Sequence, residues 1–103
     1  MKKVVLIILH NLSFSSQNRV RISQHSRVLA VMKKALTVGE PIDHHRIAAS
    51  TCWALMSSSQ KAKGRLKSAG FVERFETIMK LHTEEDRNIP LYHLEAAFEL
   101  LNS

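Results

Sequence analysis

The chain has 103 residues and is 45% hydrophobic, so it can bury the core of one small domain. Its formal net charge of +6 favours a partner that carries negative charge, either nucleic acid or an anionic surface. The single cysteine excludes an internal disulfide, and no apolar run reaches the length of about 20 residues that spans a bilayer. We therefore expect one cytoplasmic domain over residues 1–103, with no membrane partner.

The charge is distributed unevenly along the chain. Residues 1–32 carry five Lys or Arg and no acid, and residues 33–74 carry eight against three acids. Residues 75–103 carry only two against six acids. The first two thirds of the chain are therefore expected to meet an anionic partner, and the C-terminal third is not.

Residues 1–25 are predicted to form an N-terminal extension with strand character. The run "KVVLIIL" at 3–9 is continuous and rich in β-branched residues, which is typical of a buried strand. Periodicity alone does not exclude a short helix there. The segment "RVRIS" at 19–23 is predicted to be a second short strand.

Three helices are predicted between residues 26 and 69. Apolar residues from Val28 to Leu36 recur at helical spacing, with Ser26 able to cap the start of that helix and Gly39 suited to its end. Asp43 can cap a second helix through "HHRIAAST", and "CWALM" then forms an apolar connection. The hydroxyls of residues 57–59 can cap a third helix, which must end near residue 69 because Gly70 suits a left-handed position.

The region after residue 70 is ambiguous. The apolar residues of segment 71–81 fit either a helical stripe or one side of a strand. The polar cluster "TEEDRN" at 83–88 indicates a turn, and "IPLYHL" after it has strand character. We favour a hairpin here, followed by a short amphipathic helix at "LEAAFELL".

Three segments resemble winged helix-turn-helix domains: "PIDHHRIAAST", "RLKSAGFVER" and "RNIPLYHLEAAFELL". The resemblance covers residues 26–102 and implies a mainly α fold with a small antiparallel β-hairpin (α+β). Such a fold has a three-helix core, a wing and a C-terminal helix. The chain departs from the pattern in two places. "CWALM" replaces the usual glycine-containing turn, so either that turn is longer or the second helix extends, and the wing tip "EEDRN" is mostly acidic.

The basic third helix is the predicted recognition helix for double-stranded DNA. An α-helix fits the major groove, where Gln can pair with adenine and Lys with guanine. Residues near the start of the helix are expected to read bases, whereas later cations are expected to grip phosphates. The predicted DNA-binding residues are Ser57, Ser58, Gln60, Lys61, Lys63, Gly64, Arg65 and Lys67.

The sequence thus predicts a transcriptional regulator, not an enzyme, without a metal or another cofactor. The histidines lack the paired spacing of zinc sites, Cys52 beside Trp53 suits an inert core thiol, and Trp53 and Tyr92 are expected to be core residues. Two spare apolar segments, "VVLIIL" and "LEAAFELL", predict a homodimer unless they complete the monomer's core. The alternatives are a solvated basic face, a module or inhibitor that binds another protein instead of DNA, and a peripheral membrane protein held by the apolar N-terminus and its lysines.

Overall fold

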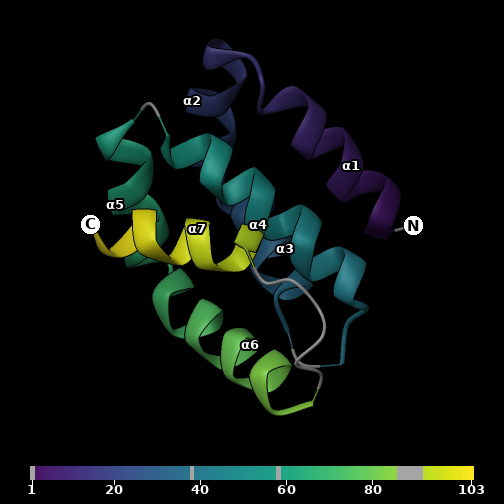
Figure 1. The fold of residues 1–103 in the computed structure, drawn as a ribbon. Helices are drawn as coiled ribbons and strands as arrows, with labels where there is room; N and C mark the ends of the chain where they lie inside the picture. Colours follow the sequence, from purple (N-terminus) through teal and green to yellow (C-terminus); the bar gives the residue numbers. More distant parts are fainter. Residues whose placement is uncertain (1, 38, 58, 86–91) are drawn as a thin grey trace.

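The chain is helical throughout the part that the structure describes. The computed structural model describes residues 2–37, 39–57, 59–85 and 92–103 (Figure 1). Seven α-helices lie in these ranges: α1 (Lys2–Leu12), α2 (Ser16–Gln24), α3 (Ser26–Ala35), α4 (Ile42–Met56), α5 (Gln60–Ser68), α6 (Phe71–Glu85) and α7 (Tyr92–Asn102). None of the helices in these ranges has the length and apolar character needed to cross a membrane.

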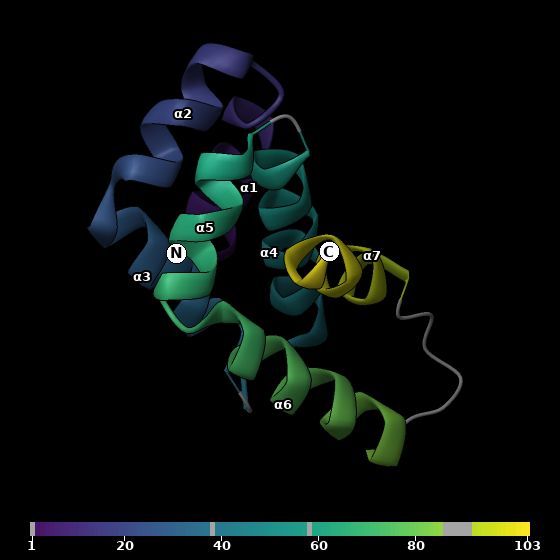
Figure 2. The same ribbon diagram turned by 90° about the vertical axis from the view of Figure 1, so that its left-hand side faces the viewer.

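Helix α4 is the centre of the packing. It contacts α1, α2, α3, α5 and α7, and Figure 2 shows α2, α3 and α5 on one side of it and α7 on the other. Eight of its fifteen residues are buried, including Ala48, Cys52 and Leu55 without exposed surface. All seven helices contribute side chains to one hydrophobic core. Burial on several sides of α4 explains why its apolar residues do not follow a single stripe.

The fold class predicted from the sequence is wrong, beginning with the N-terminal strands. Segment 3–9 lies in α1, with Leu6 buried and Leu9 and His10 half-buried at helical spacing. Segment 19–23 lies in α2, where Ile22 and Ser23 are buried. The β-branched residues favoured strands only weakly, and contact with α4 outweighed that preference.

The predicted hairpin wing is also wrong. Segment 71–81 lies in α6, whose Phe71, Phe75 and Ile78 are fully buried at the i, i+4, i+7 positions of a helical stripe. Of the second predicted wing strand, the first residues lie outside the described ranges and Tyr92 begins α7. The described ranges contain no strand, so the domain is all-α and lacks the wing of the family it resembles.

The predictions between residues 26 and 70 are mostly confirmed. Helix α3 begins at Ser26, although His25 takes the capping position. Helix α4 begins one residue before Asp43 and continues through "CWALM", which is therefore not a connection. Ser59 caps α5 by accepting a hydrogen bond from the backbone N–H of Ala62 at 3.1 Å. Gly70 has φ +86°, the left-handed conformation expected of it.

Candidate interaction surfaces

The predicted recognition helix, α5, packs on the molecule through its apolar side. Ala62 and Leu66 are buried, while the opposite side meets solvent. At 100° per residue, five exposed residues fall within an arc of about 120°. They are Gln60, Lys61, Gly64, Lys67 and Ser68. Four of the predicted DNA-binding residues thus share one face. Ser57 is exposed just before the helix, and Ser58 lies outside the described residues.

Two other predicted cations point into the molecule instead. Lys63 is only 7% exposed, and its ammonium donates hydrogen bonds to the Ser103 hydroxyl at 2.8 Å and carbonyl at 3.3 Å. Arg65 is half-buried and donates to the buried Ser23 hydroxyl at 3.3 Å. Lys63 therefore links α5 to the end of the chain, and Arg65 links α5 to α2. Neither extends freely from the helix surface toward a phosphate backbone.

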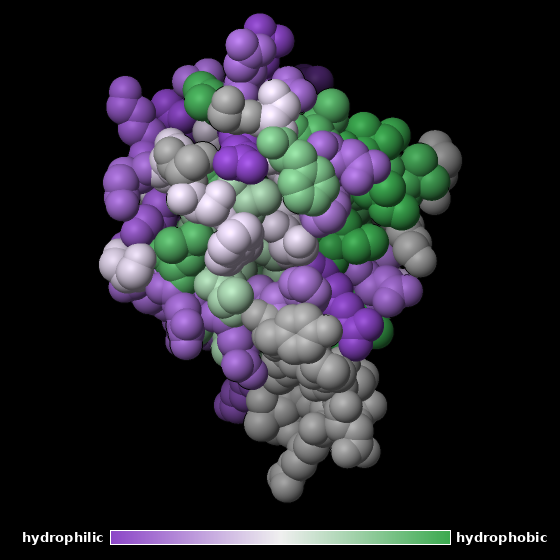
Figure 3. Space-filling view, turned by 45° about the horizontal axis from the view of Figure 1, so that its top comes forward, coloured by the Kyte–Doolittle hydropathy of each residue, from purple (hydrophilic) through white to green (hydrophobic). Residues whose placement is uncertain are grey.

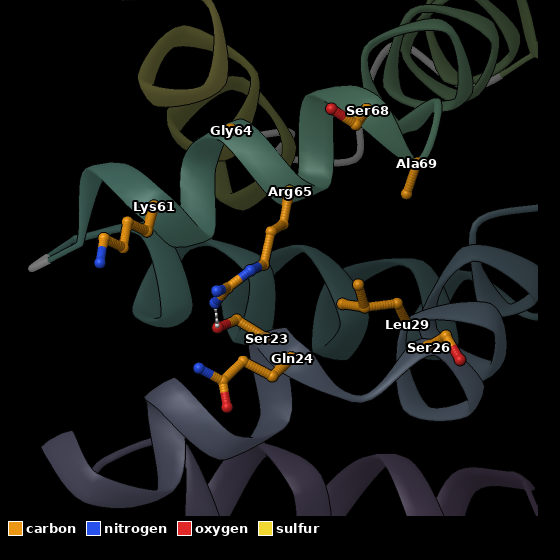
Figure 4. Close-up of a pocket in the computed structure, with 9 residues that line it drawn as sticks. All are labelled: Ser23, Gln24, Ser26, Leu29, Lys61, Gly64, Arg65, Ser68 and Ala69. Atoms are coloured by element: carbon orange, nitrogen blue, oxygen red, sulfur yellow. Dashed lines mark hydrogen bonds between the residues drawn. The ribbon is translucent and has the colours of Figure 1, made fainter.

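A hollow of about 650 Å³ lies between α5 and the α2–α3 junction (Figure 4). Lys61 and Arg65 line it from α5, and Ser23, Gln24 and Ser26 line it from the other wall. Its α5 wall includes Gly64, where an added Cβ would meet nothing within 4 Å. The hollow is therefore open and carries positive charge. The α2–α3 wall could not be predicted from the sequence. Its residues lie about 40 positions from α5 along the chain, and no local sequence pattern indicates a contact across such a separation.

The outer face of α1 and the turn after it form a second surface, which we call the α1 apolar face. It consists of exposed aliphatic and aromatic side chains: Val4, Val5, Ile7, Ile8, Leu12 and Phe14. Val4 is 59% exposed and Phe14 63% exposed, and Figure 3 shows hydrophobic side chains gathered over this region. An exposed apolar patch of this extent is typical of an interaction surface. The sequence contained an indication of this surface, because a helix that is apolar on every side is normally buried on every side.

The α1 apolar face is held by specific contacts. His10 Nε2 lies 2.9 Å from the Ser50 hydroxyl of α4, and its ring packs edge-on against Phe14 with centroids 5.0 Å apart. Arg19 donates to the carbonyls of Ser13 and Phe14 and so fixes the turn between α1 and α2. The face is therefore a structured surface with a defined orientation on α4.

The two apolar segments behind the predicted homodimer differ in exposure. Leu94, Ala97 and Leu101 of α7 are buried, chiefly against α4, so this segment completes the core. Only the segment in α1 keeps an apolar face in solvent. The homodimer remains a prediction, and α1 is the surface through which it would form.

The sequence also singles out a cysteine, residue types that bind metals and two large aromatic side chains. Cys52 is fully buried, and burial raises the pKa of its thiol far above the ordinary value, so it stays protonated. No three His, Cys, Asp or Glu side chains in the described ranges gather as metal ligands would. Trp53 was predicted to lie in the core, which is wrong because it is 47% exposed. The side chain of Tyr92, predicted for the core as well, lies outside what the structure describes.

Comparison with known proteins finds similarity to a stretch of rotatin. The chain is 33% identical to human rotatin over 106 residues and 32% identical to mouse rotatin over 105 residues. These matches cover 95% and 94% of this chain but 5% of each rotatin, so the chain spans about one twentieth of the length of these relatives. No protein-family model and no solved structure matches the chain.

Proposed function

We propose that this chain is a helical protein-interaction module whose α1 apolar face binds an amphipathic helix. The observation that carries the proposal is the exposure of six large apolar side chains on one structured face. Leaving such side chains in water is unfavourable, and a partner that covers them gains about 25 cal/mol for each Å² of apolar area removed from solvent. Similarity to one short stretch of a much longer protein also supports a role as one structural unit among several.

The charge around the α1 apolar face defines the chemistry of the partner. Residues 1–39 contain seven Lys or Arg and no acid. Exposed Lys34 lines a small hollow beside Leu6 and Val31 at one edge of the face, and Arg19 contacts the Phe14 carbonyl at another. A partner helix with Leu or Ile on one side and Glu on its flanks matches both the apolar surface and its positive rim.

A second copy of the chain is a poorer match for the same face. In a symmetric dimer the same surface meets itself, so Lys34 and Arg19 at the edges of the face would approach the basic edges of the other copy. Repulsion between like charges opposes that arrangement. Sedimentation equilibrium tests whether the chain dimerises through this face. A homodimer that is lost in Ile8→Glu would assign the α1 apolar face to a second copy of the chain and not to a partner helix.

The proposal is tested with a synthetic amphipathic helix as the probe. One fluorescent peptide carries Leu on one face and Glu on its flanks, and its matched control carries Lys in place of Glu. Fluorescence anisotropy should show binding of the Glu peptide and weaker binding of the Lys peptide. Ile8→Glu should lose binding of the Glu peptide, because the complex would then bury an unpaired charge.

Val20→Glu is the matched control variant. Val20 is 46% exposed and Ile8 51% exposed, but Val20 lies on α2, outside the α1 apolar face. It should bind the Glu peptide like the unaltered protein. Equal losses in both variants, or no binding of either peptide, would refute the assignment of this face to a partner helix.

DNA binding through α5 is the second candidate function. It is supported by Gln60, Lys61, Gly64 and Lys67 on one exposed face, the residue types that read bases and contact phosphates. The described ranges contain no wing to support it, Lys63 is engaged inside the molecule, and Arg65 lines the hollow beside α2 and not the exposed face of α5. Few cations are therefore left to grip the phosphate backbone.

Duplex DNA at several salt concentrations separates the two candidates. DNA binding should weaken steeply as salt rises, because each phosphate contact releases a counterion. Lys61→Ala should then weaken binding to a preferred site more than to random DNA, whereas Lys67→Ala should weaken both equally. Absence of binding at low salt would remove this candidate and leave the α1 proposal unaffected.

A further inference from the structure

Three neighbouring hollows along α3 share lining residues, and we call the surface that they form the furrow. The hollow of Figure 4 shares Ser26, Leu29 and Ala69 with a neighbouring hollow of about 220 Å³. That neighbour shares Lys33 with a third hollow of about 340 Å³, which reaches Thr37 and Arg74. The furrow therefore runs from the α2–α5 contact, along α3, to the start of α6.

Positive charge is spaced along the whole furrow. Lys61 and Arg65 line one end, Lys33 the middle and Arg74 the other end. Among the described lining residues, Glu73 is the only acid. An occupant with several negative charges in a row would match this arrangement better than one compact anion.

The two arginines of the furrow are positioned in advance. Arg65 donates to the Ser23 hydroxyl at 3.3 Å, and Arg74 donates to the Thr37 hydroxyl at 2.9 Å. Each guanidinium has five N–H donors, so such a bond leaves donors that can pair with a carboxylate in the fork geometry. The hydroxyls thus orient both groups before an occupant arrives and reduce the entropy lost on binding.

We propose that this furrow binds an extended acidic peptide segment of a partner protein. Its lining includes Leu29, Ala30 and Ala69, which suit small apolar side chains between the acidic ones. None of its described lining residues is aromatic, whereas sites for single-stranded nucleic acid use aromatic rings to stack bases.

The length of the furrow sets the length of the peptide. Ser26 to Thr37 corresponds to about 16 Å at ~1.5 Å per helical residue. An extended chain rises about 3.3 Å per residue, so about five residues fill this distance. In such a chain alternate side chains point the same way, so acids at every second position would share one side of the peptide.

The experiment compares a fluorescent peptide of alternating Glu and Ala with its Gln and Ala counterpart. The full chain should bind the Glu peptide and not the Gln peptide, and binding should weaken with salt. Lys61→Gln, Lys33→Gln and Arg74→Gln should each weaken binding about two- to fivefold, the range of exposed ion pairs. Gly64→Gln should also weaken binding by placing a side chain at the edge of the first hollow, without unfolding α5, because glutamine is a better helix former than glycine.

Two matched variants test whether position matters and not total charge alone. Lys67→Gln and Lys80→Gln each remove one exposed cation outside the furrow and should leave binding unchanged. Losses equal to that of Lys61→Gln would overturn the proposal, as would equal binding of the Gln peptide. Tighter binding of single-stranded or duplex DNA, weakened by the same furrow variants, would assign the surface to nucleic acid instead. Ile8→Glu should leave binding of the acidic peptide unchanged, which keeps this test separate from the α1 proposal.

Discussion

Helices α1 and α7 are both eleven residues long and both are rich in apolar side chains, yet they bury them differently. Helix α7 places Leu94, Ala97 and Leu101 against the core, with its exposed positions polar or small. Helix α1 buries Leu6 on one side and exposes Val4 and its neighbours on the other. The two helices show that apolar content alone does not distinguish a core element from an interaction surface.

The difference has an energetic meaning. Burial of an apolar side chain within the chain stabilises folding, whereas an exposed one contributes to stability only when a partner covers it. The α7 residues should therefore be required for folding in isolation. The outer residues of α1 should tolerate change in the free protein and become important in the complex.

The largest expected effect is on the stability contributed by α7. Leu94→Ala should lower the free energy of unfolding by about 2 to 5 kcal/mol, because it leaves a cavity at a position that is 1% exposed. Leu12→Ala on α1 is the matched control, since Leu12 is 44% exposed and should cost about 1 kcal/mol or less. Urea unfolding followed by circular dichroism measures both, and equal losses would break the comparison.

The pH dependence of unfolding tests the burial of α4, which both helices cover. Burial raises the pKa of the Cys52 thiol, so the folded state keeps a proton that the unfolded state loses above about pH 8.5. The free energy of unfolding should therefore fall as pH rises above that value, by about 1.4 kcal/mol per pH unit. Cys52→Ala should remove this slope between about pH 8.5 and 10. The same slope in both proteins would show that Cys52 is accessible.

A double-mutant cycle tests the link that holds α1 to α4. His10→Ala and Ser50→Ala should show a coupling of about 1 kcal/mol, because their side chains lie 2.9 Å apart. Val4→Ala paired with Ser50→Ala provides the control. Val4 is 59% exposed and lies six residues before His10 on α1, so its coupling to Ser50 should be close to zero. A His10–Ser50 coupling near zero would mean that α1 is held by apolar packing alone.

The smallest expected effect is a gain in stability. Gly64 lies inside α5 with open space where a Cβ would be, so Gly64→Ala should raise the free energy of unfolding by about 0.5 to 1 kcal/mol. Val4→Ala on α1 is the comparison, and it should bring no gain in the free energy of unfolding. A loss of stability in Gly64→Ala would indicate that α5 packs more closely than its open surface suggests.

The helices that could be predicted from the sequence are those with local signals at their ends. Ser59 caps α5, and Gly70 ends the turn after it, in agreement with the expected chemistry of these residues. Helix α1 could not be assigned in this way, because a short β-branched run is compatible with either a strand or a helix until its contacts are known. Its packing on α4 decided the outcome.

The candidate surfaces were only partly predictable for the same reason. The exposed face of α5 follows from its helical period, which placed Gln60, Lys61 and Gly64 outward. The inward direction of Lys63 depends on Ser103, which lies 40 residues away, and the orientation of Arg65 depends on Ser23, 42 residues away. Contacts across such separations arise from tertiary packing, and a single sequence carries no local sign of them.

Gly70 connects the turn of the chain to the proposed binding surface. It adopts φ +86°, and a Cβ at this position would lie 3.0 Å from the ammonium nitrogen of Lys33, the central cation of the furrow. Any L-amino acid here would strain the passage from α5 to α6 and also displace that lysine. In a saturation screen, substitutions at Gly70 should therefore be lost both in a selection for folding and in a selection for binding of the acidic peptide. Substitutions at Gly64 should survive the selection for folding and be lost in the selection for binding.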